Sequence, residues 1–178
     1  DIKLDRNTPI RSAHIQFTCD EPSAGPTSLI IAGEDTGDAA RFSSDSHDLS
    51  SRERTGAEVG WNPPAWLLPG AAAGAQRTEN LAPIIQAVIA RDDWKPGNSL
   101  AFLITGSGKR VASAFRSGSK KAARLVVDIG DSDGGLPEDL TPVRYRLRML
   151  FGLPEPNDEV DPIFDVYVQD ELVLSDVT

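Results

Sequence analysis

The sequence predicts an all-β protein: a jelly-roll-type β-sandwich with one short helix, followed by a C-terminal β-meander. Apolar residues alternate with polar or small ones in several short runs, the pattern of strands that are buried on one face. Turn-forming residues separate these runs, and the chain holds 15 glycines and 13 prolines. Only one segment has the spacing of an amphipathic helix, which excludes a series of alternating strands and helices.

The first strands are predicted over residues 10–19 and 27–32, with a turn cluster between them, and together they form a hairpin-like unit. Residues 33–38 are a polar loop. We expect residues 39–54, which are rich in Ser and Asp, to be irregular surface.

The centre of the chain carries a strand at residues 57–61, which Asn62-Pro63-Pro64 ends because proline cannot donate to a sheet. A helix follows over about residues 80–91. Thr78 stands where an N-cap would, and Pro83 fits the first turn, where its missing N–H costs nothing. The apolar stripe of this helix has i, i+3, i+4 spacing and consists of Leu81, Ile84, Ile85, Val88 and Ile89.

A strand at residues 99–105 leads through the tight turn 106–108 into an alternating run at 109–115, which predicts a hairpin. Residues 124–129 form another strong strand. The run at 144–151, a strand at 163–168 and a short run at 172–174 make a meander that is too small to bury a core alone.

Charge divides the chain at Asp128. Residues 1–127 hold 15 basic and 14 acidic residues, whereas residues 128–178 hold 3 and 13. We therefore predict a β-sandwich module at 1–129, a linker at 130–141, and a meander at 142–178 that docks on the module or begins a second domain. The net charge of −9 argues against nucleic acid and anionic membranes as partners.

Cys19 is the only cysteine, so no internal disulfide is possible, and alternation with Ile15 and Phe17 predicts a buried thiol. No apolar run is long enough to insert into a membrane, and no signal-peptide pattern is present. Because the chain starts with Asp, we expect it to be a piece of a longer protein.

An ordered series of motifs resembles the DNRLRE-like, carbohydrate-binding-module-like β-sandwiches of large secreted bacterial proteins. These motifs are IRSAHIQFT (10–18), SLIIAGED (28–35), VGWNPPAW (59–66), QRT (76–78), WKPGNSL (94–100), GSGKRVA (106–112) and LVV (125–127). Two later strings, YRLRMLF (145–151) and FDVYVQD (164–170), are similar to the middle strands of malectin-type domains. The resemblance implies an extracellular or cell-surface location and an association with sugars.

Carbohydrate binding requires exposed aromatic rings with polar neighbours, and the candidates are Trp61, Trp66, Gln76 and Arg77. The alternative is that both tryptophans belong to the core, because burying an indole stabilises the fold by several kcal/mol. Polysaccharide or a surface glycan is the partner that the first interpretation implies, and self-association or contact with other domains of the parent protein is the second.

Calcium is the candidate metal, because hard cations take several oxygen ligands from a tight loop. The loop that carries Glu34, Asp35 and Asp38 offers three carboxylates, and residues 128–133 offer a second set. Neither loop has the spacing of a helix-loop-helix calcium site, and an acidic turn can equally be a solvated turn.

Catalysis is the least favoured hypothesis. His14 is expected on the solvent face of its strand, and His47 lies in a Ser/Asp loop without a Gly-x-Ser-x-Gly nucleophile turn. Two hypotheses remain: a non-catalytic extracellular module that binds carbohydrate or a surface component, or a structural assembly domain whose meander pairs with a neighbouring chain. Exposed tryptophans would favour the first, and buried tryptophans with a docked or swapped tail would favour the second.

Overall fold

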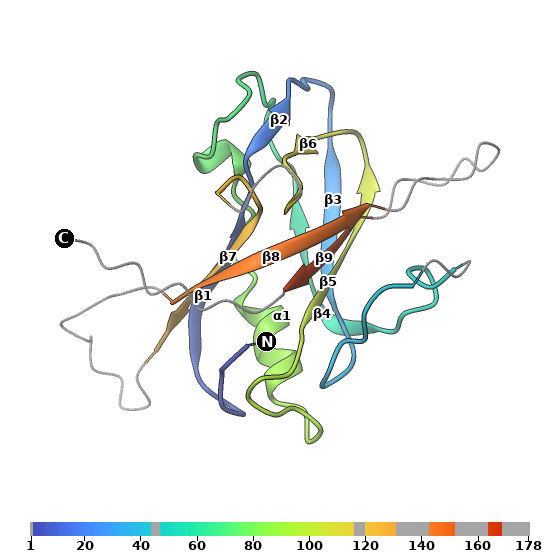
Figure 1. Ribbon diagram of the computed structural model, residues 1–178, viewed down its shortest axis with the longest axis vertical. Coiled ribbons are helices and arrows are strands. Elements are labelled where there is room, and N and C mark those ends of the chain that lie inside the picture. Colours follow the sequence, from blue (N-terminus) through green and yellow to red (C-terminus); the bar gives the residue numbers. More distant parts are fainter. Residues whose placement is uncertain (1, 44–46, 116–119, 131–142, 152–163, 169–178) are drawn as a thin grey trace.

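The computed structural model (Figure 1) describes residues 2–43, 47–115, 120–130, 143–151 and 164–168. Most of these residues lie in antiparallel strands, and the described part of the chain contains one α-helix. The prediction of an all-β fold with one helix is therefore confirmed.

Seven strands form one continuous sheet in the order β1-β7-β8-β9-β5-β3-β4, and every neighbouring pair is antiparallel. A separate pair, β2 with β6, lies at one end of the molecule (Figure 1). The strands are β1 (Ile10–Gln16), β2 (Cys19–Glu21), β3 (Ser28–Glu34), β4 (Arg54–Trp61), β5 (Ala101–Ser107), β6 (Val111–Ala112), β7 (Arg124–Ile129), β8 (Val143–Phe151) and β9 (Phe164–Val168).

Both predicted hairpins are wrong, although their strands exist. β1 pairs with β7 and not with β3, and β6 pairs with β2 and not with β5. The chain turns at the end of β5, where Gly106 (φ 136°) is still in the strand and Gly108 (φ 96°) follows it. Both glycines lie so close to the backbone of Ser28 and Thr27 that a side chain would clash. This close approach sends the chain away from β5 towards β2.

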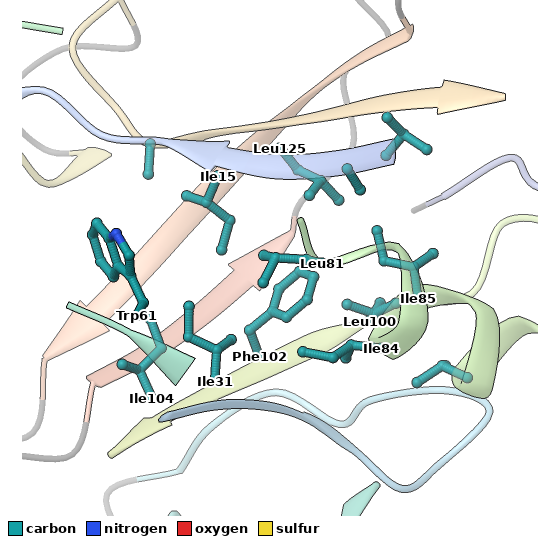
Figure 2. Close-up of a cluster of buried hydrophobic side chains, with 14 of the residues drawn as sticks. Ile15, Ile31, Trp61, Leu81, Ile84, Ile85, Leu100, Phe102, Ile104 and Leu125 are labelled. Atoms are coloured by element: carbon teal, nitrogen blue, oxygen red, sulfur yellow. The ribbon is translucent and has the colours of Figure 1, made fainter. Parts of the chain in front are cut away.

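The sheet is curled, so that β1 and β7 face β3 and β5 across the core (Figure 2). Ile15 and Leu125 point into this space from one side, and Ile31, Phe102 and Ile104 from the other; the exposed fraction of each side chain is 3% or less. Each such burial stabilises the fold by about 1.5–3 kcal/mol.

The helix α1 (Ala82–Ile89) closes one end of the curled sheet and contacts β1, β3 and β4. The predicted stripe faces the core, because Leu81, Ile84, Ile85, Val88 and Ile89 are all buried. Pro83 lies in the first turn, as expected.

The predicted N-cap is wrong. Leu81 is the capping position, and the Thr78 hydroxyl oxygen instead accepts a hydrogen bond from the Ile15 N–H at 2.9 Å. The Asn80 side-chain oxygen accepts from Ala82 N–H at 3.0 Å, in the first turn of the helix, and also from Ala13 N–H at 2.9 Å.

These bonds belong to a continuous cover over the outer edge of β1. Residues 76–81 run beside that edge, where Phe17 N–H donates to Gln76 O at 2.9 Å and Leu81 N–H donates to Ala13 O at 2.7 Å. Gln86 extends the cover from α1, since its side-chain oxygen accepts from Ile10 N–H at 3.1 Å. One end of the sheet is thus protected from further pairing.

The two C-terminal strands lie in the middle of the sheet. β8 pairs with β7, placing Arg144 opposite Val126, and β9 pairs with β5, placing Val166 opposite Phe102. In Figure 1 they cross the front of the molecule as the orange and red arrows. The predicted linker at 130–141 and the predicted strand at 172–174 lie outside the described residues except for Gly130.

Candidate binding site

The tryptophans predicted as a sugar platform are core residues. The exposed fraction is 4% for Trp61 and 1% for Trp66. Phe17 stacks on Trp61 with ring centroids 5.4 Å apart, and the two indoles lie 6.3 Å apart at 52°. The Trp66 N–H donates to Ala75 O at 2.7 Å, which satisfies its polar atom inside the protein. Neither ring presents a face on which a sugar could stack.

Gln76 and Arg77, the two polar candidates, also contact other groups of the protein. Gln76 is 3% exposed, and its side-chain oxygen accepts from Ala73 N–H at 3.0 Å. Arg77 is exposed, with its Nε 3.5 Å from the Gln16 side-chain oxygen. Of the four residues predicted to bind carbohydrate, only Arg77 is open to solvent.

The three carboxylates predicted to bind calcium point to different partners. Glu34 pairs with Arg52 at 2.8 Å, Asp35 pairs with Arg91, and Asp38 accepts from Ser99 N–H at 2.8 Å. Within the described ranges, no three His, Cys, Asp or Glu side chains come together in a way that could hold a metal ion. Calcium binding stays a prediction without structural support.

Arg52 is a structural centre that the sequence interpretation missed. Its side chain is 7% exposed, pairs with Glu34 and Asp48, and donates to Ala40 O at 3.0 Å. The guanidinium also lies over the Phe42 ring, 4.2 Å from its centroid. Arg52 therefore organises the segment that was expected to be irregular surface. The i, i+4 spacing of Asp48 and Arg52 was the available signal.

Arg91 makes a second link between distant segments. It pairs with Asp93 at 2.8 Å and with Asp35, and so joins the end of α1 to the acidic loop. The hydrogen bonds from Arg91 are the main reason that the pKa of Asp93 lies below its usual value. Ion pairs with arginines of the protein thus hold the loop that carries Glu34, Asp35 and Asp38 in place.

Arg110 is the third such arginine. It donates to Pro63 O at 2.8 Å, to Pro64 O at 2.9 Å and to Gly25 O at 3.0 Å. Partial burial lowers the pKa of this guanidinium without neutralising it. Its contacts fix the proline segment after β4 against the loop before β3.

The residues considered for catalysis are not assembled around a reactive group. His14 is half-buried on β1, and burial, followed by the nearby Arg77, lowers the pKa of its imidazole. His47 is exposed in the loop between β3 and β4. Cys19 is 1% exposed, and burial followed by the charge of Asp20 raises the pKa of its thiol, which makes it unreactive.

The distinctive arrangement is the slot between β5 and β7 that β8 and β9 fill. In the described sheet, β9 supplies the second partner of β5, and β8 supplies the second partner of β7. The slot edges are apolar and inaccessible: the exposed fractions of Phe102, Leu103, Leu125 and Val127 are 0–1%. Alternation indicated these strands, but it does not state which strands become neighbours.

Comparisons with protein-family models, with curated proteins and with solved structures find no match. The resemblance to secreted β-sandwich modules therefore stays a prediction. A search of the described residues finds no helix that is both long enough and apolar enough to span a membrane.

Proposed function

We propose that this protein is a non-catalytic structural module of an extracellular or cell-surface protein, and that it assembles by strand complementation. In this proposal β8 and β9 complete the sheet of their own chain, and the same slot receives this strand pair from a neighbouring copy. The facing halves of the curled sheet support a jelly-roll-type β-sandwich as the description of the module.

The position of β8 and β9 carries the proposal. Loss of a strand pair from the edge of a sheet leaves the remaining strands paired. Loss of a pair from the centre of a sheet separates its two halves. Without it, Ala101–Ile104 of β5 and Arg124–Val127 of β7 would each have an unpaired backbone edge beside apolar side chains. Such edges pair readily with a strand from another chain.

Carbohydrate binding has less support. It relied on Trp61 and Trp66, whose rings pack against Phe17 in the core. Exposing either ring would forfeit several kcal/mol of burial energy. Buried tryptophans together with a docked C-terminal strand pair are the combination that the assembly hypothesis predicts.

The test is to place a protease site within residues 131–142 and to cut the chain after it has folded. We expect the 143–178 fragment to stay bound after cleavage, because backbone hydrogen bonds on both sides hold its strands. Fluorescently labelled peptide 143–168, added in excess, should then replace it, and size-exclusion chromatography would measure the replacement. The matched control is a peptide of the same composition in scrambled order.

Release of the fragment on cleavage, with unchanged tryptophan fluorescence and unchanged thermal unfolding, would disprove strand complementation. A glycan array run on the uncut protein tests the other hypothesis. Saturable binding to one glycan, retained after the fragment has been exchanged, would favour carbohydrate recognition instead.

A further inference from the structure

Positive charge gathers where β7 meets β8. From Trp94 to Val127 the chain holds seven basic residues and no acidic one, and this stretch runs into β7. Residues 128–178 hold only three basic residues, and all of them lie in β8: Arg144, Arg146 and Arg148. The pairing of β7 with β8 therefore joins the cationic parts of both regions of the chain.

The register places two arginines directly opposite each other. Leu125 and Val127 are buried in the core, so Arg124 lies on the outward face of β7, where it is half-buried. Its partner on β8 is Arg146, and directly opposite residues of antiparallel strands have Cβ atoms about 4.5–5.5 Å apart. Like charges in this position destabilise a sheet. An anion held between them would remove the repulsion.

Arg77 extends this row across β1. Arg124 is also the register partner of Gln16, and an isolated bridge joins Gln16 to Arg77. The Arg77 Nε donates to the Gln16 side-chain oxygen at 3.5 Å. Neither Arg77 nor Arg124 has an ion pair among the described residues, whereas Arg11, on the same strand as Gln16, pairs with Asp128 at 3.7 Å.

The chemistry of the row favours an oxyanion as its ligand. A guanidinium is planar, and its parallel N–H donors match two oxygens of a phosphate or sulfate group. Arg144 and Arg148 share a face of β8 with Arg146, each about 6.6–6.8 Å from it along the strand, so they could serve further groups of a polyanion. A nucleic acid duplex, with one charge per roughly 1.7 Å, would be repelled by the 27 acidic residues of the chain.

We propose that the seam between β7 and β8 is an oxyanion-binding site, at which a phosphate or sulfate group bridges Arg124 and Arg146. The group is either free or part of a polyanion that also reaches Arg77. Because Arg146 belongs to the C-terminal strand pair, the bound anion ties that pair to β7. This tie rests on the strand complementation proposed above, whereas binding itself needs only the pairing of β7 with β8 in one chain.

Sulfate titration of the uncut full chain tests the site. Sodium sulfate should raise the unfolding temperature saturably, in comparison with sodium chloride at equal ionic strength. Arg124→Gln and Arg146→Gln should each weaken sulfate binding at least about tenfold, because each removes a charge-assisted donor pair. Arg11→Gln is the matched control, since it removes the same charge from the neighbouring strand but from an arginine that Asp128 already pairs. Sulfate also stabilises folded proteins by exclusion from their surface, and all the variants keep that general effect.

NMR locates the anion and identifies its source. The side-chain Nε–H resonances of Arg124 and Arg146 should shift on addition of sulfate with one dissociation constant, whereas that of Arg11 should not. Tripolyphosphate then replaces sulfate. Binding that is at least about tenfold tighter, and that Arg77→Gln weakens, would identify a polyanion as the ligand. Binding no tighter than that of sulfate would identify a free oxyanion.

Equal stabilisation by sulfate of the wild type, Arg124→Gln and Arg11→Gln would overturn the site, and so would sulfate that acts no differently from chloride. A separate measurement tests the tie to β7. In protein cut within residues 131–142, sulfate should slow the replacement of the 143–178 fragment, and Arg124→Gln should abolish the slowing. Replacement at an unchanged rate despite sulfate binding would overturn the tie alone. A fragment that leaves at once on cleavage would contradict strand complementation and leave the titration of the uncut chain as it stands.

Discussion

Trp66 shows how a single side chain separates the two candidate functions. A tryptophan beside a proline-rich loop can be a binding platform or a core residue, and the choice depends on whether its N–H finds a partner inside. Ala75 O provides that partner, while Phe17 and Trp61 surround the ring. The ring is therefore more valuable to stability than to recognition.

We expect Trp66→Ala to lower the free energy of unfolding by about 3–5 kcal/mol, the usual cost of removing a buried tryptophan. Trp66→Phe keeps most of the apolar contacts and loses the hydrogen bond, so its cost should be about 1–2 kcal/mol. Urea unfolding followed by circular dichroism measures both. A stable Trp66→Ala variant that had lost affinity for a glycan would contradict the core assignment.

His14 makes the stability of the fold depend on pH below the unfolded pKa of its imidazole. Burial, and then Arg77, lower the pKa of the folded imidazole, whereas the unfolded pKa is about 6.5. The folded state therefore binds the proton less well than the unfolded state does. The contribution to stability is present above the unfolded pKa and is lost as the pH falls below it.

Replacing the His14 imidazole should remove this loss of stability at low pH. We expect His14→Gln to narrow the difference in unfolding free energy between pH 7.5 and pH 5.5, because the variant has no imidazole to protonate. Arg77→Gln should narrow this difference in unfolding free energy by a smaller amount, because the charge of Arg77 contributes less than burial to the lowered pKa of His14. Urea denaturation at the two pH values provides the measurement, and an unchanged difference in His14→Gln would show that other groups control it.

At the scale of elements, side chains from the 76–86 segment do the work of a missing strand. Thr78 and Asn80 accept from the outward N–H groups of Ile15 and Ala13, positions that a neighbouring strand would otherwise occupy. The Thr78 hydroxyl, which was expected to cap the helix, thus caps the sheet, whereas the Asn80 side-chain oxygen accepts from both the helix and the sheet edge.

Removing these acceptors should expose individual amides. Thr78→Val should accelerate hydrogen exchange at Ile15, and Asn80→Ala should accelerate it at Ala13, each with a loss of about 1–2 kcal/mol in stability. Exchange monitored residue by residue in NMR spectra tests the pairing, because each variant serves as the control for the other. Equal acceleration at both amides would instead indicate a general loosening of β1.

Local pattern predicted the elements well and their neighbours poorly. The seven long strands and the apolar stripe of α1 were evident from alternation and helical spacing, which depend only on nearby residues. The pairing of β1 with β7 and the insertion of β9 beside β5 depend on contacts between distant segments. The candidate sites failed for a related reason: Trp61, Glu34 and Asp35 are the right residue types, but distant partners occupy them.

At the scale of the whole molecule, the sheet unites segments that charge and composition separate. The acidic C-terminal third supplies two strands to the centre of a nearly neutral N-terminal region. A boundary in composition at Asp128 is therefore not a boundary in hydrogen bonding, because β7 pairs with β8 directly across it.

We expect the two regions to unfold together. All three tryptophans lie between residues 61 and 94, whereas the two tyrosines, Tyr145 and Tyr167, lie in β8 and β9. Fluorine NMR of protein labelled with fluorotryptophan or fluorotyrosine therefore reports each region separately. Coincident urea midpoints would support a single cooperative unit. An earlier tyrosine transition would show that the C-terminal strands detach alone.

The central place of β8 and β9 also has a consequence for biosynthesis. Translation produces these strands after all the other strands of the sheet, so β5 and β7 leave the ribosome before their middle neighbours exist. The nascent polypeptide must keep the unpaired edges of β5 and β7 apart until the final strands emerge. During that interval it is open to chaperones and to aggregation. Slow translation near residue 130 would prolong this vulnerable stage instead of helping the polypeptide to mature.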